Sequence, residues 1–107
     1  MIQIDVRRDS RGQIRELRCS GHAVFNEEGG VDIVCAGVSA LMGALVLGLT
    51  EVVGVAAEIQ EGDGLLHVSL PDSLSSEQEH SAQVLMCTTQ LALCELARNY
   101  KGFIVFS

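Results

Sequence analysis

The sequence predicts an α+β fold: a two-layer sandwich with a mainly antiparallel sheet, two helices on one face, and the element order ββαββαβ. Three observations lead to this prediction. Two pairs of strand-like segments are each joined by a short turn, two long segments have helical character, and a short apolar segment closes the chain. Strands joined by tight turns pair antiparallel, and helices that follow such hairpins pack against the sheet they form. The 107 residues fit one domain over 1–107, with no linker or repeat.

The first hairpin is predicted from alternation and a turn signal. Ile2, Ile4 and Val6 alternate with polar neighbours, as in a half-buried strand. The turn residues 9–12 follow, and segment 13–19 places Leu17 and Cys19 on one face. These two segments therefore predict an antiparallel pair.

A second hairpin and a last strand complete the predicted sheet. Segments 55–60 and 65–70 flank the glycine-rich turn Gly62-Asp63-Gly64, and Pro71 ends the second of them. Segment 102–106 is short and apolar, and is expected to return to the sheet as its last strand.

The first predicted helix spans about 35–53, with Asp32 near its start and Gly54 at its end. It is apolar nearly all round, so it needs cover on more than one side. A domain of this size offers one sheet face and one neighbouring helix. A second copy of the chain is expected to cover the rest, which predicts a homodimer.

The same segment has some features of a membrane span. No charged residue lies in 33–50, which approaches the roughly 20 apolar residues that a span requires. However, Gly37, Gly43 and Gly48 interrupt it, and no cluster of Lys or Arg flanks it. A buried helix and no membrane contact are therefore expected.

The second predicted helix spans 75–97. Ser75 and Gln78 have the spacing of a capping box, in which each side chain bonds the other residue's backbone N–H. On this helix Cys87 and Cys94 share a face, which predicts packing, and His80 is expected at the surface. His67 alternates with the apolar residues of its strand, so it is expected to face solvent.

Charge and cysteine content exclude some function classes. The formal net charge of −7 argues against nucleic acid, whose binding normally needs a basic surface, and suits a basic peptide or protein partner. The chain has no CxxC pair and opens on a strand-like segment rather than a secretory leader, so free thiols in a reducing, cytoplasmic environment are expected. Cys19, with His22, Asp32 and Cys35, matches no familiar zinc spacing, and neither a metal nor a cofactor is expected.

Cys35 and His22 are the candidates for chemistry. Cys35 lies in the first turn of the long helix, where free N–H groups and the helix dipole favour a thiolate, the reactive form of cysteine. The backbone N–H groups of Cys35 and Ala36 are expected to receive an oxyanion. His22, at the end of the preceding strand, would act as general base. Asp32 would either orient that imidazole or cap the helix.

The pattern of Cys35 and His22 is weak by itself, because a cysteine on an apolar helix is usually a core residue. The segment between them is irregular and contains Gly29-Gly30, which allows wide backbone angles. We expect it to close over an extended peptide as a substrate loop. Its residues are Ala23, Val24, Phe25, Asn26, Glu27, Glu28, Gly29, Gly30 and Val31.

Gly-His-Ala at 21–23 and Asp-Ile-Val-Cys-Ala-Gly-Val-Ser-Ala-Leu at 32–41 together resemble the signature of the ribosomal-processing cysteine protease family, Prp. The resemblance implies a dimeric endopeptidase with a Cys–His dyad, Cys35 being the nucleophile and His22 the base. Asp32 and Ser39 match family positions beside the site. It further implies removal of an N-terminal segment from ribosomal protein twenty-seven of the large subunit, after a motif ending in two phenylalanines.

A function of another class stays open at this point. The chain could be a non-catalytic dimeric module that binds a ribosomal protein or an assembling ribosome, using its acidic surface and its apolar helix. This alternative predicts that Cys35 and His22 can be replaced without loss of function.

Overall fold

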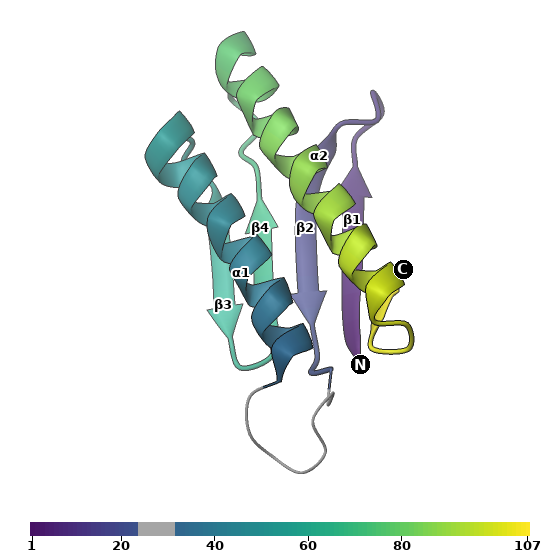
Figure 1. The fold of residues 1–107 in the computed structure, drawn as a ribbon. Helices are drawn as coiled ribbons and strands as arrows, with labels where there is room; N and C mark the ends of the chain where they lie inside the picture. Colours follow the sequence, from purple (N-terminus) through teal and green to yellow (C-terminus); the bar gives the residue numbers. More distant parts are fainter. Residues whose placement is uncertain (24–31) are drawn as a thin grey trace.

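The computed structural model describes residues 1–23 and 32–107. Within these residues, five strands and two α-helices follow each other in the predicted order, and a π-helix extends the first α-helix (Figure 1). Their bounds are β1 Ile2–Arg8, β2 Ile14–Ser20, α1 Ile33–Leu47, the π-helix η1 Gly48–Val53, β3 Glu58–Gly62, β4 Leu65–Ser69, α2 Ser76–Asn99 and β5 Ile104–Phe106.

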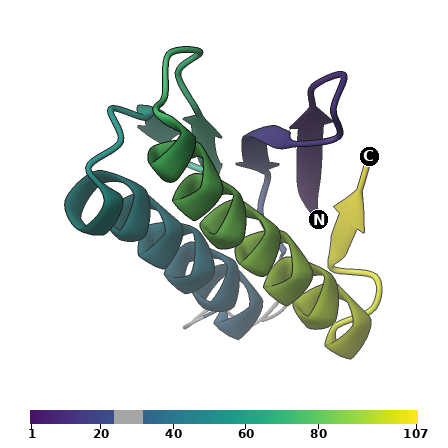
Figure 2. The same ribbon diagram turned by 90° about the horizontal axis from the view of Figure 1, so that it is seen from above.

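The five strands form one sheet in the order β3-β4-β2-β1-β5. Every neighbouring pair is antiparallel except β1 and β5, which are parallel. Both helices lie side by side over the same face of this sheet (Figures 1 and 2). The predicted two-layer α+β sandwich, with a mainly antiparallel sheet and the order ββαββαβ, is confirmed.

The buried core between the two layers contains aliphatic, methionine and cysteine side chains, and Tyr100, Phe103 and Phe106 pack against its edge. The buried residues of α1 are Val34, Val38, Met42 and Leu45, which recur every three or four positions and so form one stripe. The largest fully buried side chains of the whole core are Ile4, Ile14, Leu17, Met42, Leu45, Leu49, Met86, Leu93, Val34 and Val68.

The first predicted helix corresponds to two consecutive elements. Residues 33–47 are α-helical, and 48–53 continue as the π-helix η1, which ends at the left-handed Gly54 (φ 80°). Val55 is then buried and donates its N–H to the Leu49 carbonyl at 2.8 Å. Strand β3 therefore begins at Glu58 rather than at 55 as the sequence predicted.

The outer side of this helical segment is uncovered. Ile33 is 50% exposed, Leu47 60% and Val52 83%. By length and composition alone, the stretch Ile33–Val53 would be long and apolar enough to cross a membrane. Its inner stripe, however, forms part of the core of this fold.

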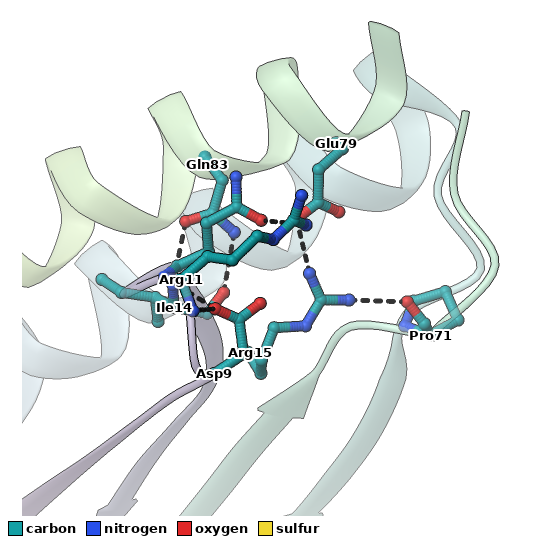
Figure 3. Close-up of polar contacts among 8 residues, drawn as sticks. Asp9, Arg11, Ile14, Arg15, Pro71, Glu79 and Gln83 are labelled. Carbon is teal, nitrogen blue, oxygen red and sulfur yellow. Dashed lines mark hydrogen bonds and ion pairs between the residues drawn. The ribbon is translucent and has the colours of Figure 1, made fainter. Parts of the chain in front are cut away.

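A polar cluster ties the β1–β2 hairpin to α2 and to the segment before it (Figure 3). The Arg15 guanidinium, in a residue only 8% exposed, forms an ion pair with Glu79 Oε1 at 2.5 Å and donates to the Pro71 carbonyl at 2.8 Å. The Gln83 amide bonds both backbone groups of Ile14, accepting from its N–H at 2.9 Å and donating to its carbonyl at 2.8 Å.

Replacing Glu79 by alanine is expected to lower the free energy of unfolding by about 2–3 kcal/mol, since it leaves a largely buried guanidinium without its counter-ion. For a domain of this size the melting temperature should fall by roughly 10 °C. The matched control is Glu95→Ala, which removes an exposed carboxylate paired with Arg98 one turn away. Equal melting temperatures for the two variants would show that the Arg15–Glu79 pair adds nothing to stability.

Candidate active site

His22 follows directly after β2, and a glycine makes its position possible. Gly21 has φ +92°, and a Cβ placed there would lie 2.4 Å from the carbonyl oxygen of Met1. Only glycine fits this close approach without strain. The Gly21 N–H donates to the Gly64 carbonyl at 2.8 Å, and the Met1 nitrogen donates to the His22 carbonyl. The His22 backbone is thus fixed between β1 and the β3–β4 turn, while its side chain is 58% exposed.

Cys35 lies in the first turn of α1, as the sequence predicted. Asp32 is the N-cap, and its Oδ1 accepts from the N–H of Val34 at 3.0 Å and of Cys35 at 3.1 Å. Cys35 is partly buried, and its Sγ accepts a hydrogen bond from the Ala23 N–H at 3.3 Å. The start of the helix and this N–H both direct partial positive charge towards the sulfur.

Of the two roles left open for Asp32, its Oδ1 performs the capping role. The Cys35 N–H donates to Asp32 Oδ1, and the Ala36 N–H donates to the Asp32 carbonyl at 2.9 Å. The expectation that both N–H groups are free is wrong, because the capping residue accepts a hydrogen bond from each. An oxyanion could reach them only by sharing them with Asp32.

A groove of about 520 Å³ lies between α1 and the β3–β4 hairpin, and it contains both candidate residues. His22, Cys35 and Ser39 all line it, so the structure brings these three together. Its apolar lining comes from α1, through Val38, Met42, Val46 and Leu47, and from strands β1, β3 and β4, through Ile2, Ile59, Leu65 and Leu66. Its acidic lining residues are Glu61 and Asp63.

The segment Gly62-Asp63-Gly64, predicted only as the turn of a hairpin, also contacts His22. Gly62 pairs with Leu65, so the turn proper is Asp63–Gly64. Asp63 Oδ1 lies 3.5 Å from His22 Nε2. No local signal could reveal this contact, because it joins residues far apart in the sequence.

Cys19 also lines the groove, but its thiol is chemically different from that of Cys35. Burial, and secondarily the charge of Asp5, raises the pKa of Cys19 to about 11. Cys19 therefore stays a neutral thiol at physiological pH. In the described ranges, 1–23 and 32–107, no three His, Cys, Asp or Glu side chains are grouped so that they could hold a metal ion.

The remaining candidates lie away from the groove. His80 is exposed, as predicted. His67 is on the predicted face of its strand, but it is half-buried there and lies 2.7 Å from Glu16 Oε1. The predicted packing of Cys87 is wrong, since its side chain is exposed, whereas Cys94 is partly buried. Of the predicted substrate loop, Val24 to Val31 lie outside the described residues, and Ala23 is buried beside Cys35.

The chain is similar to proteins of known activity. A family model described as cysteine protease Prp matches residues 1–105. The ribosomal processing cysteine protease Prp of Bacillus subtilis (strain 168) is 34% identical over 103 residues, which cover 94% of this chain and 91% of that protein.

Solved structures agree with this match. The essential ribosomal processing protease Prp from S. aureus, crystallised with a covalently linked product peptide, has a TM-score of 0.86 and 27% identity, covering 100% of this chain and 98% of that one. A second crystal structure of that protease, with a substrate peptide, has a TM-score of 0.83 and 24% identity at the same coverage, and shows likeness of fold alone.

Proposed function

Because the chain belongs to the Prp family of cysteine proteases, we propose that it removes the N-terminal extension of ribosomal protein twenty-seven of the large subunit during ribosome assembly. Cys35 is the proposed nucleophile and His22 the proposed general base. The observation that carries this proposal is the groove that both side chains line, with the thiol at a helix N-terminus.

In the proposed reaction, Cys35 Sγ attacks the carbonyl carbon of the scissile peptide bond while the His22 imidazole takes the thiol proton. The tetrahedral intermediate collapses, the C–N bond breaks, and the imidazolium returns that proton to the leaving amine. Water, deprotonated by the same imidazole, then attacks the thioester carbonyl carbon. The C–S bond breaks, the new carboxyl end leaves, and the imidazolium returns its proton to the Cys35 sulfur. Neither a metal nor a cofactor takes part in these steps.

The lining of the groove supports a peptide with large apolar side chains near the cut. Val38, Met42 and Val46 of α1 line it together with Ile59 and Leu66 of the sheet, and burying an aromatic side chain against such a lining is favourable. A cleavage motif that ends in two phenylalanines would suit this surface. The S. aureus protease, crystallised with substrate and product peptides, is a relative for which peptide binding is known.

The acidic charge supports a basic partner. Glu61 and Asp63 line the groove, and the chain carries a net charge of −7. Ribosomal proteins are generally basic because they bind RNA. The negative electrostatic potential of this surface would therefore raise the rate at which they associate with the protease.

The uncovered side of the helical layer supports a homodimer. Ile33, Leu47 and Val52 on the α1–η1 segment are exposed, as are Val84 and Leu91 on α2. We propose that a second copy covers this surface. Size-exclusion chromatography with light scattering should give twice the mass of one chain, and Leu91→Asp should shift it towards the single-chain mass. A wild-type monomer at micromolar concentration would rule out the dimer.

We place the proposed reaction in the cytoplasm, where ribosomes assemble and thiols stay reduced. All four cysteines are unpaired in the structure, and the nucleophile must be a free thiol.

The proposed substrate is tested by incubating the purified protein with the large-subunit ribosomal protein encoded in the same genome. Mass spectrometry should detect loss of an N-terminal segment at a single bond. If that ribosomal protein carries the extension and stays intact, the substrate assignment is wrong, although the protease assignment would survive cleavage of another peptide.

A further inference from the structure

We propose that the β3–β4 turn, Asp63–Gly64, positions the imidazole of His22 for catalysis. The inference rests on the proposed function, in which His22 is the general base. Asp63 and Gly64 are positioning residues here, since neither would touch the scissile bond.

Gly64 acts through the space that its missing side chain leaves. It has φ +66°, and a Cβ built on it would lie 2.7 Å from His22 Nε2 and 3.2 Å from His22 Cδ2. A Cβ is essentially never found at 2.7 Å from another heavy atom, so any other residue at 64 would displace the ring. The imidazole thus lies directly against the backbone of the turn.

The backbone of the turn is fixed to the backbone beside the histidine. The Gly64 carbonyl accepts from the Gly21 N–H at 2.8 Å, one residue before His22. This hydrogen bond holds the β3–β4 turn against the backbone next to His22. An imidazole in contact with Gly64 is therefore held in a defined position relative to its own backbone. Defined placement matters because a catalytic group displaced by about 1 Å can lose on the order of a hundredfold in rate.

Asp63 acts through its charge. Its Oδ1 is 3.5 Å from His22 Nε2, which is longer than a hydrogen bond but within the range of an ion pair. When His22 takes the proton of Cys35, the Asp63 carboxylate faces a positive ring and stabilises it without accepting the proton. Its side chain is 99% exposed, so water and salt weaken the attraction.

Other charged or titratable groups also lie on this part of the groove. Cys35 approaches from α1, Glu61 lines the groove from β3, and the Met1 nitrogen is bound to the His22 carbonyl rather than to the ring. Among the described residues, Asp63 is the carboxylate within ion-pair distance of the His22 ring.

The first test compares Gly64→Ala with Gly12→Ala. Gly12 also has a left-handed φ, +82°, but a Cβ there meets nothing within 4 Å, so the control carries the backbone strain without the contact. For peptide cleavage, Gly64→Ala should lower kcat by about ten- to a hundredfold, with KM changed less than about twofold. Gly12→Ala should retain kcat.

The same variants have a spectroscopic readout. The chain has three histidines, so imidazole ¹⁵N spectra are simple to assign. In Gly64→Ala the His22 signals should move while those of His67 and His80 stay in place. Wild-type kcat together with unmoved His22 signals in a folded Gly64→Ala protein would overturn the inference.

Asp63→Asn provides a second test that does not threaten the fold, because the side chain is almost wholly exposed. At low ionic strength kcat should fall by about two- to fivefold, and the deficit should shrink at about 1 M salt. The control, Asp72→Asn, removes another exposed carboxylate and should leave kcat unchanged. Equal kcat for both variants at low salt would remove Asp63 from the proposal.

Two variants distinguish an error in the positioning role of the turn from an error in the assignment of His22 as the base. A His22→Ala protein with full activity would refute the base assignment itself. A His22→Ala protein without activity, beside a Gly64→Ala protein with wild-type kcat, would refute only the positioning role of the turn.

Discussion

Replacing Cys35 by alanine is expected to abolish peptide cleavage, with a loss in kcat on the order of 10⁴-fold or more. Among the described residues, no other cysteine can replace Cys35 as the nucleophile. The Cys19 thiol shares the groove, but burial raises its pKa to about 11, so it is neutral and a poor nucleophile at pH 7. Cleavage of the ribosomal protein or a derived peptide, followed by mass spectrometry, measures the effect.

The fold should tolerate this change, because Cys35 is only partly buried and alanine is a good helix former. The matched control is Cys87→Ala, which removes an exposed thiol on α2 and should leave cleavage unchanged. A Cys35→Ala protein that still cleaves at the wild-type rate would contradict the assignment of the nucleophile. A folded variant that keeps a cellular function without cleavage would favour the alternative, a non-catalytic module that binds a ribosomal protein.

Replacing His22 by alanine is expected to have the second largest effect, a loss in kcat on the order of 10²- to 10⁴-fold. The variant keeps the thiol but loses the group that accepts its proton and later protonates the leaving amine. His80→Ala is the control, since His80 is exposed on α2 and does not line the groove. If both histidine variants cleave as fast as the wild type, a different group is the base.

The sequence predicted the elements and the start of α1 well, because those signals are local. Asp32 is a strong N-cap type three residues before Cys35, and alternation placed β1, β2 and β4 correctly. The Ser75–Gln78 capping box likewise marked the start of α2 and is present in the structure.

Errors arose where backbone geometry depends on tertiary contacts. The change from α- to π-helix at Gly48 has no sequence signal comparable to a cap, and the left-handed Gly54 then delays β3 by a few residues. Cys87 was misplaced because the buried stripe of α2 runs through neighbouring Met86 rather than through Cys87.

The site itself was predicted in part. Local motifs identified Cys35 and His22, and the structure places both in one groove. What could not be predicted is how the site is supported, since each supporting contact joins distant segments. Gly21 meets Met1 and Gly64 meets His22 only after the sheet has formed.

The most direct test of the thiol–imidazole pair is the rate at which iodoacetamide alkylates each cysteine at pH 7, in the wild type and in His22→Ala. Cys87 is exposed and serves as the accessible reference thiol. Cys19 is buried, which raises its pKa, and serves as the unreactive reference. We expect Cys35 to react faster than Cys87 despite its lower exposure, and His22→Ala to slow the alkylation of Cys35 alone by about tenfold or more. Equal rates for Cys35 in the two proteins, or a Cys35 no faster than Cys87, would contradict this expectation.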